Sequence, residues 1–436
     1  MYLVYSALLV LWLLISSPYW LIQMTRHGKY RAGLRERLGG VPDRLRGSSQ
    51  PAIWVHAVSV GEVLAVSGLI SELADRYPEF RIVISTTTDT GQKLARKRFG
   101  DDRVFYFPLD LPFSVRRYLN ALRPKLIVVA ETEFWPNFFR IAKESGARIA
   151  VVNARISDRS FPGYLRISGW IRRVLANVDL FLTQTEQDRS RLLAIGAASE
   201  RVQVTGNLKF DVDPPPAPPV VAGLRRVFQE TNTCPILVCG STVEGEEGLL
   251  LQAMQNILAT HPRAVMLLAP RHPERFAEVA HLLESLGGRF WRRSLWNGES
   301  ISGGVMLVDT IGELAALYAV ADIAFVGGSL VPRGGHNIIE PAQYGVPIVV
   351  GNHTENFRDI VGLFQSRNAV RIVGPAELPL VFLELISDAA ERKNLGQRAL
   401  DTLHSQRGAT HRTLQALATM LPEPVPASPP GDAATS

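Results

Sequence analysis

The stretch Lys125-Leu126-Ile127-Val128-Val129-Ala130-Glu131-Thr132-Glu133 decides the fold. Its unbroken apolar run indicates a strand buried on both faces, and the acidic residues behind it mark the end of that strand. Short apolar runs also occur at 53–58, 81–85, 148–152 and 180–183, separated by longer amphipathic stretches such as 62–76. Strands that alternate with helices predict a parallel, doubly wound α/β sheet.

A proline-rich segment interrupts this pattern near the middle of the chain. Five of the six residues 214–219 are proline, which excludes a helix or a central strand and predicts a stiff connector. Apolar runs then resume at 236–239, 264–268, 305–308, 323–326 and 347–350. We therefore predict two Rossmann-like domains, 25–213 and 220–421, joined by a hinge at 214–219 and facing a cleft, as in GT-B glycosyltransferases. The Pro-, Ala- and Ser-rich tail 422–436 is expected to be disordered.

The N-terminus predicts a membrane anchor. Residues 1–24 contain no charged side chain, and about twenty apolar residues in a helix can cross the hydrocarbon core of a bilayer. Seven basic and two acidic residues follow between Thr25 and Gly47, a net +5 out of the chain's +6, which indicates that the side after the anchor is cytoplasmic. A helix lying in the membrane interface is the alternative. The rest of the chain is close to neutral and has no nucleic-acid-binding motif, so we expect no nucleic-acid partner.

The sequence lacks the motifs that define several classes of protein. The chain has no G-x-G-x-x-G after an early strand and no G-x-x-x-x-G-K-[ST], which argues against dinucleotide enzymes and P-loop NTPases. Its two cysteines, Cys234 and Cys239, supply neither a disulfide framework nor a zinc site. The pair Asp211 and Asp213 resembles the D-x-D of metal-dependent transferases, but no His or third acid lies close in sequence. We expect no metal and no cofactor.

Acidic residues follow two of the predicted strands. Glu62 lies in the first turn of a predicted helix, where an acid complements the helix dipole, but its place at the end of a strand also makes it a candidate for chemistry. Glu131 and Glu133 come directly after a buried strand, where acids are rarely without function. In the same loop as Glu62, Ser59 lies in A-x-S-x-G, which resembles a nucleophile elbow, so a serine hydrolase is a remote alternative.

Two junctions in the second half are suited to phosphate binding. Arg271 follows a strand and opens a helix, and its guanidinium can hold two phosphate oxygens. The run Asn337-Ile338-Ile339-Glu340 follows a Gly-rich loop and predicts a helix start, whose backbone N–H groups bind anions. Glu340 is also suited to accept hydrogen bonds from sugar hydroxyls.

Several motifs together resemble the bacterial Kdo (3-deoxy-D-manno-octulosonic acid) transferases of lipid A biosynthesis, from residue 1 to about 410. The motifs that carry the resemblance are Gly28-Lys-Tyr-Arg31, Glu36-Arg-Leu-Gly39, His56-Ala-Val-Ser-Val-Gly-Glu62, Glu131-Thr-Glu133-Phe-Trp-Pro-Asn137, Asn153-Ala-Arg155, Thr205-Gly-Asn-Leu-Lys209-Phe-Asp211, Pro270-Arg-His-Pro-Glu-Arg-Phe276 and Gly334-Gly-His-Asn337. The proline-rich hinge and tail depart from the family pattern.

The resemblance implies an inverting, metal-independent transfer of Kdo from CMP-Kdo to the lipid A precursor lipid IVA, at the cytoplasmic face of the bacterial inner membrane. It assigns proton acceptance to Glu62 and support of the transition state to Glu131 and Lys209. It implies that CMP binds at Pro270 and Arg271, at Ile311, Gly312 and Glu313, and at Asn337, Ile338, Ile339 and Glu340. Another lipid-linked nucleotide-sugar transferase of the same fold remains the nearer alternative. The number of Kdo units added, the acyl preference and the oligomeric state stay open.

Overall fold

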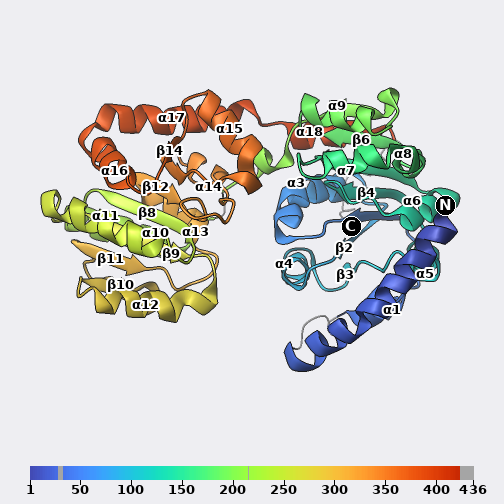
Figure 1. Ribbon diagram of the computed structural model, residues 1–436, viewed down its shortest axis with the longest axis horizontal. Helices are drawn as coiled ribbons and strands as arrows, with labels where there is room; N and C mark the ends of the chain where they lie inside the picture. The colour runs from blue at the N-terminus through green and yellow to red at the C-terminus, as the bar shows by residue number, and fades with distance from the viewer. Residues whose placement is uncertain (28–32, 215, 423–436) are drawn as a thin grey trace, which may run out of the picture. The chain divides into compact units, whose positions relative to one another are not determined.

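The computed structural model describes residues 1–27, 33–214 and 216–422, and the chain forms two compact units (Figure 1). The first unit contains residues 1–212 and the residues from Gln406 on, and the second contains residues 213–405. The motif at 28–31 and nearly all of the tail predicted from 422 on lie outside the described residues.

The first unit is built on a parallel seven-stranded sheet with the strand order β3-β2-β1-β4-β5-β6-β7. Its central strand β4 contains the apolar run 125–130 that predicts a buried strand, and six of its seven residues are buried. The strands are β1 (Ala52–His56), β2 (Arg81–Thr86), β3 (Val104–Tyr106), β4 (Pro124–Ala130), β5 (Arg148–Ala154), β6 (Leu180–Thr183) and β7 (Val202–Val204). The predicted doubly wound fold of this half is confirmed.

Helices cover both faces of this sheet, so its core has two halves. Trp54 lies at the centre of one half, with its ring centroid 4.9 Å from that of Phe138 and 5.4 Å from that of Phe105. This half is covered by α5 (Pro112–Leu122), α6 (Pro136–Glu144) and α8 (Ser168–Leu175). The other half packs against α3 (Val60–Arg76), α4 (Asp89–Phe99) and α18 (Ala409–Ala418). The remaining helices of this unit are α1 (Tyr2–His27), α2 (Leu34–Arg37), α7 (Phe161–Arg166) and α9 (Glu186–Ala194).

The second unit repeats the architecture with the strand order β10-β11-β9-β8-β12-β13-β14, and every pairing is parallel. Its strands are β8 (Ile236–Thr242), β9 (Val265–Pro270), β10 (Phe290–Arg292), β11 (Gly304–Leu307), β12 (Ile323–Val326), β13 (Ile348–Gly351) and β14 (Arg371–Val373). Its helices are α10 (Pro219–Glu230), α11 (Glu247–Thr260), α12 (Phe276–Ser285), α13 (Leu314–Leu317), α14 (Ile339–Ala342), α15 (Arg358–Ser366), α16 (Leu378–Ser387) and α17 (Ala389–Ser405).

The C-terminal boundary expected at residue 421 is wrong, because the chain returns to the first unit at Gln406. The reason is the cap of α18: both carboxylate oxygens of Asp211 accept hydrogen bonds from backbone N–H groups, at 2.7 Å from Gly408 and at 2.5 Å from Thr410. Leu414 and Leu417 of α18 then bury themselves against the core beside α3. A polar cap and an apolar face together hold this last helix on the first unit.

Candidate active site

Glu62 sits where β1 gives way to α3. Ser59 caps α3: its Oγ accepts a hydrogen bond from the backbone N–H of Glu62 at 3.4 Å, and its hydroxyl donates to Glu62 Oε1 at 3.0 Å. Glu62 Oε2 accepts a further bond from the N–H of Val58 at 2.8 Å. This reciprocal arrangement is close to a capping box, and it fixes the carboxyl group in one orientation at the carboxyl edge of the sheet.

The surroundings of Glu62 raise the pKa of its carboxyl group towards neutrality. Its side chain is buried, with 9% of the residue exposed. Burial raises the pKa of the Glu62 carboxyl to about 7, and the negative charge of Glu131 adds to that rise, while the hydrogen bonds from Val58 and Ser59 oppose it. Desolvation is therefore the main cause, and a carboxyl group with this pKa is well matched to general-base catalysis at physiological pH.

Glu131 and Lys209 lie together in the same unit. Lys209 Nζ is 3.0 Å from Glu131 Oε1, in an ion pair that is about one quarter exposed on each side. Glu131 adopts a left-handed backbone conformation (φ 55°), unusual for a residue with a side chain, and its N–H donates to the carbonyl of Val152. Strain of this kind persists where the surrounding structure enforces it, and it is concentrated at functional sites.

Three further side chains support this edge: the sequence analysis named Glu133 as a candidate but missed Asn153 and His56 as site residues. Asn153 also has a left-handed backbone (φ 53°), and its Oδ1 accepts from the N–H of Leu208, which holds the turn that carries Lys209. His56 is fully buried, stacks on Phe107 at 3.9 Å, and has its pKa lowered by burial to about 3, so it is neutral at physiological pH. Glu133 is partly buried beside Glu131, and burial raises the pKa of its carboxyl.

In the second unit the predicted residues gather at the carboxyl ends of β9 and β12. Pro270 is the last residue of β9, and Arg271 follows with its side chain exposed and its N–H bonded to the carbonyl of Thr242. Burial raises the pKa of the Glu340 carboxyl, while the Arg271 charge and the Asn337 amide oppose that rise. Burial lowers the pKa of His336 to about 4, and the Arg271 charge lowers it further. The structure thus brings His336 and Glu340 each within electrostatic reach of Arg271.

The other two predicted CMP segments are arranged as follows. Asn337 Oδ1 accepts from the N–H of Ile339, and α14 begins at Ile339, two residues later than Asn337, so the predicted helix start is only a four-residue turn. Ile311 is 79% exposed and Gly312 has φ 91°, after β11, the strand beside β9. Glu313 is held by Arg293, whose guanidinium lies 2.8 Å away. Its carboxylate is therefore already paired.

Glu246 organises the glycine-rich loop of this unit, and the sequence analysis did not single it out. Its residue is fully buried, and its two oxygens accept hydrogen bonds from four backbone N–H groups, at Val243, Gly328, Ser329 and Leu330. A Cβ at Gly327 would lie 2.6 Å from the carbonyl oxygen of Ser241, 2.7 Å from Thr242 Cα and 2.8 Å from Glu246 Oε2, which explains the glycine. The loop after β12 is thereby fixed in one shape before any ligand arrives.

The contacts of Ser59 and Asp211 give little support to a serine hydrolase or to a metal site at the D-x-D pair. The Ser59 hydroxyl donates to Glu62, and within the described chain no histidine side chain forms a hydrogen bond with it. Asp211, of the D-x-D pair, has both oxygens engaged by backbone N–H groups of α18. Across residues 1–27, 33–214 and 216–422, no group of three or more His, Cys, Asp and Glu side chains is placed to hold a metal ion.

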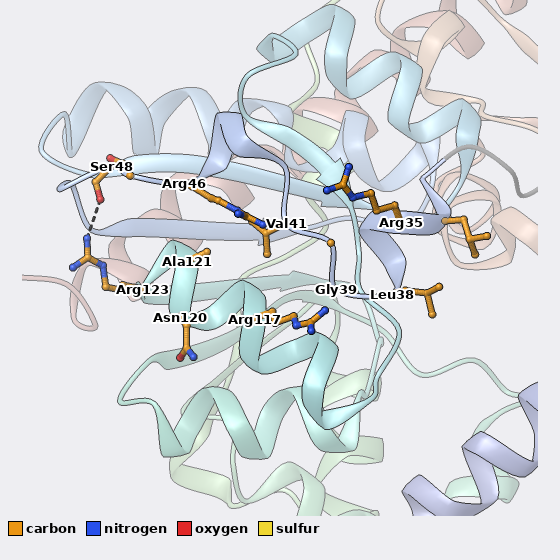
Figure 2. A pocket seen from close by; sticks show the side chains of 13 residues that line it. Arg35, Leu38, Gly39, Val41, Arg46, Ser48, Arg117, Asn120, Ala121 and Arg123 are labelled. Carbon is orange, nitrogen blue, oxygen red and sulfur yellow. Dashed lines mark hydrogen bonds between the residues drawn. The ribbon is translucent and has the colours of Figure 1, made fainter.

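A basic groove lies elsewhere on the first unit, between α5 and the segment 34–48 (Figure 2). It has a volume of about 1080 Å³, and it is lined by Arg35, Arg46, Arg117 and Arg123 but by no acidic residue. The arginines of the basic N-terminal segment are not all alike. Arg44 pairs with Glu36 at 3.2 Å and Arg37 lies over the ring of Tyr106. Among the described residues of this segment, Arg35 and Arg46 line the groove, and Arg46 also lies 3.6 Å from Asp43 Oδ1.

Comparison with known proteins gives one consistent result. The family described as 3-Deoxy-D-manno-octulosonic-acid transferase (kdotransferase) matches residues 32–212. The chain is 35% identical over 393 residues to the 3-deoxy-D-manno-octulosonic acid transferase of Haemophilus influenzae, covering 89% of this chain and 91% of that protein. It is also 35% identical over 405 residues to the enzyme of that name from Bordetella pertussis, covering 89% and 92%.

Among solved structures, the chain resembles the UDP-GlcNAc 2-epimerase of Neisseria meningitidis, with a TM-score of 0.56 over 85% of this chain and all of that one. A second UDP-N-acetylglucosamine 2-epimerase gives a TM-score of 0.58 over 85% of this chain and 96% of that one. The sequence identities are only 14% and 13%, so these likenesses show the fold alone.

Proposed function

This chain belongs to the family of 3-deoxy-D-manno-octulosonic acid transferases, and on that premise we propose that it transfers Kdo from CMP-Kdo to lipid IVA with inversion and without a metal ion. The observation that carries the mechanism is the buried carboxyl of Glu62, with its pKa raised to about 7 at the edge of the first sheet.

Glu62 is the proposed general base. In the transfer, a hydroxyl of the acceptor attacks the anomeric carbon of Kdo, the bond from that carbon to the CMP phosphate oxygen breaks, and Glu62 takes the hydroxyl proton. One base on the side opposite the leaving group is sufficient for inversion, whereas retention by double displacement needs a nucleophile as well. Val58 and Ser59 already orient the Glu62 carboxyl by hydrogen bonds, so it needs no reorganisation to accept the proton.

Glu131 and Lys209 are the proposed stabilisers of the transition state. The sugar carbon gains positive charge as CMP departs, and a carboxylate such as that of Glu131 stabilises this charge. Lys209, whose Nζ lies 3.0 Å from Glu131 Oε1, pairs with that carboxylate and offers a cation for the negative charge of the donor.

The second unit is the proposed CMP-binding unit. Arg271 supports binding of the single phosphate, because a guanidinium holds two oxygens at once. Glu340 follows β12 and lies near the Arg271 charge, and its carboxyl is suited to accept hydrogen bonds from ribose hydroxyls. Asn337 Nδ2 donates a hydrogen bond to Glu340 Oε1 and supports this side chain. Ile338 and Ile339 are buried and position this turn, while Ile311 to Glu313 form the proposed third contact. A monophosphate leaving group carries less charge than a diphosphate, and Arg271 and Lys209 are suited to neutralise it without Mg²⁺.

Membrane lipids are the proposed surroundings, on the cytoplasmic face of the bacterial inner membrane. The described chain contains one helix segment, Tyr2–Trp20, that is long and apolar enough to cross a membrane, and this apolar segment is not buried inside the structure. The basic groove supports attraction to anionic headgroups. A glycolipid acceptor made in that leaflet gives such attachment a purpose.

The decisive experiment incubates the membrane-bound protein with CMP-Kdo and lipid IVA, with and without EDTA, and measures the product mass. We expect a gain of one or more Kdo units that is unaffected by EDTA. Turnover with UDP-sugars but not with CMP-Kdo would favour another lipid-linked transferase of this fold. Covalent labelling of Ser59 by a fluorophosphonate would instead indicate a hydrolase. Loss of activity with EDTA would contradict the metal-free mechanism.

A further inference from the structure

We propose that α1 lies in the plane of the membrane, with one face in the acyl chains of a bilayer that carries anionic lipids, and does not span it. This inference deepens the membrane attachment under the proposed function and rests on it. It is carried by two independent observations: where the two ends of α1 are held, and how its side chains are distributed around the helix.

The N-terminal end of α1 is docked on the first unit. Asn137 Nδ2 donates to Ser6 Oγ at 2.9 Å, and Asn177 Nδ2 donates to the hydroxyl of Tyr2 at 3.1 Å. The guanidinium of Arg140 lies 4.8 Å from the centroid of the Tyr2 ring, and Trp170 packs on Tyr5 with a centroid separation of 6.0 Å. These contacts come from α6, α8 and the residues just after α8, so this end of the helix is fixed to the folded body.

The C-terminal end of α1 is tied to the first unit by a short segment. Only residues 28–32 separate His27 from Gly33, a reach of at most about 21 Å for an extended chain. Spanning α1 would place its far end across a hydrocarbon core of about 30 Å from the docked end. Residues 28–32, which include Lys29 and Arg31, would then have to recross that core in an extended form that leaves their backbone groups without hydrogen bonds. A helix in the interface meets neither obstacle.

The side chains of α1 divide into two faces. At about 100° of rotation per residue, seven of the eight side chains in 2–20 that carry a hydrogen-bonding group fall within one arc of about 140°. These seven are Tyr2, Tyr5, Ser6, Trp12, Ser16, Tyr19 and Trp20. The opposite face is aliphatic and exposed, and it includes Leu3, Val4, Leu8, Leu11, Leu14 and Ile15. Such a helix suits an interface, because the polar tips of Tyr and Trp stay at the headgroups while the aliphatic face enters the acyl chains.

The position of Trp12 in the middle of α1 also favours a helix that lies in the membrane interface. Its side chain is 54% exposed and its ring lies edge-on to Trp20 at 6.3 Å. In a spanning helix Trp12 would lie close to the bilayer centre, whereas tryptophan prefers the headgroup level. In the plane of the interface every residue of the aromatic face lies at that level.

The test uses spin labels on the full chain bound to vesicles of phosphatidylethanolamine and phosphatidylglycerol. Single cysteines are introduced as Val4→Cys, Leu11→Cys and Leu13→Cys in a Cys234→Ser, Cys239→Ala background, and label depth is measured by collisional relaxation. Val4 and Leu11 share the aliphatic face but lie about 10 Å apart along the axis, while Leu11 and Leu13 lie about 3 Å apart along the axis on opposite faces.

We expect equal depths at Val4 and Leu11, and a shallower label at Leu13. A spanning helix gives the reverse, with Leu11 deeper than Val4 and nearly equal to Leu13, and this result would overturn the inference alone. A protein that does not sediment with the vesicles would overturn both the inference and the proposed membrane attachment. As a second measurement, Tyr5→Cys with Trp170→Cys should be joined by a short bifunctional maleimide on the vesicles, whereas Leu11→Cys with Trp170→Cys should not.

Discussion

At the scale of single residues, the mechanism depends on Glu62. Glu62→Gln keeps the size of the side chain but cannot accept a proton at neutral pH, so we expect turnover to fall by roughly 10²–10⁴-fold. CMP affinity should stay near that of the unchanged protein, because the proposed CMP contacts belong to the second unit. Transfer rate and CMP binding measured together check this, with Glu72→Gln on the same helix as the control. Near-normal turnover would reduce Glu62 to a helix-start acid and leave Glu131 and Glu133 as the candidates.

The pH dependence follows from the same residue. A base must be deprotonated, so the raised pKa of Glu62 predicts that kcat/KM rises with pH through about 7. Glu131 contributes to that raised pKa by repulsion, so Glu131→Gln should move the midpoint to lower pH besides slowing transfer. Ser59→Ala removes a donor that favours the charged carboxyl and should move it upward. pH–rate profiles of the unchanged protein and the two variants check the direction of each shift. If neither substitution moves the midpoint, the titrating group is not Glu62.

Sequence reasoning found the residues that lie directly after strands and missed those that act across long separations. Glu62 and Glu131 were selected because each follows an apolar run, which places it at the carboxyl edge of the sheet, and the electrostatics of the structure couple the two. Glu246 was missed because the groups it binds, 328–330, lie more than eighty residues away. No local pattern around Glu246 announces such a partner.

At the scale of helices and strands, prediction also depended on whether a local sequence pattern marks the element. The inner strands of each sheet were found, because each contains at least three consecutive apolar residues. The strands missed were β3, β7, β10 and β14, which are three residues each and lie at or near the sheet edges. The strands β7, β10 and β14 have no run of three apolar residues, so the hydrophobic pattern does not reveal them. The strand β3 is apolar and buried, and it was missed although its run is visible in the sequence. The assignment of α18 failed because its cap, Asp211, lies almost two hundred residues earlier.

That cap makes a prediction about stability. Asp211→Ala leaves two N–H groups of α18 without their acceptor and should cost about 1–2 kcal/mol of unfolding free energy, whereas Asp211→Asn, also a good N-cap, should lose less. Thermal unfolding of both variants beside Asp75→Ala, an exposed acid on α3, checks this. An unchanged transition in Asp211→Ala would show that α18 is held by its apolar face alone.

Two arginines flank β9, and together they allow a controlled test of the phosphate contact. Arg271→Ala removes the proposed partner of the CMP phosphate at the carboxyl end of β9, so we expect weaker CMP binding as well as slower transfer. Arg263→Ala removes an equal charge just before the amino end of the same strand and should leave CMP affinity unchanged. Calorimetric titration with CMP compares the two. Equal losses would mean that net charge, and not position, is responsible.

At the scale of the whole molecule, positive charge is concentrated at the basic groove, which we propose to attract anionic lipids. Arg35 and Arg117 line the groove, and neither has an ion-pair partner among the pairs found in the described chain, so Arg35→Gln with Arg117→Gln should leave the fold intact. We expect binding to anionic vesicles to weaken by roughly 10-fold or more at low salt, at about 1 kcal/mol for each arginine near the surface. The difference should shrink at high salt because exposed charges are screened. Lys93→Gln with Lys97→Gln on α4 is the equal-charge control in a vesicle co-sedimentation assay. The same loss of binding in both pairs would deny the groove a particular role.

The return of the chain at Gln406 makes the second unit an insertion within the first. Two covalent connections join the units, at Val212–Asp213 and at Ser405–Gln406, so a protease that cuts only in the proline-rich segment leaves them tethered. Release of the second unit needs two cuts, and a gene fragment encoding 213–405 already contains all of it. The first unit has no such contiguous fragment: a polypeptide that stops near residue 212 lacks the helix that Asp211 caps, and only a fusion of 212 to 406 would restore it.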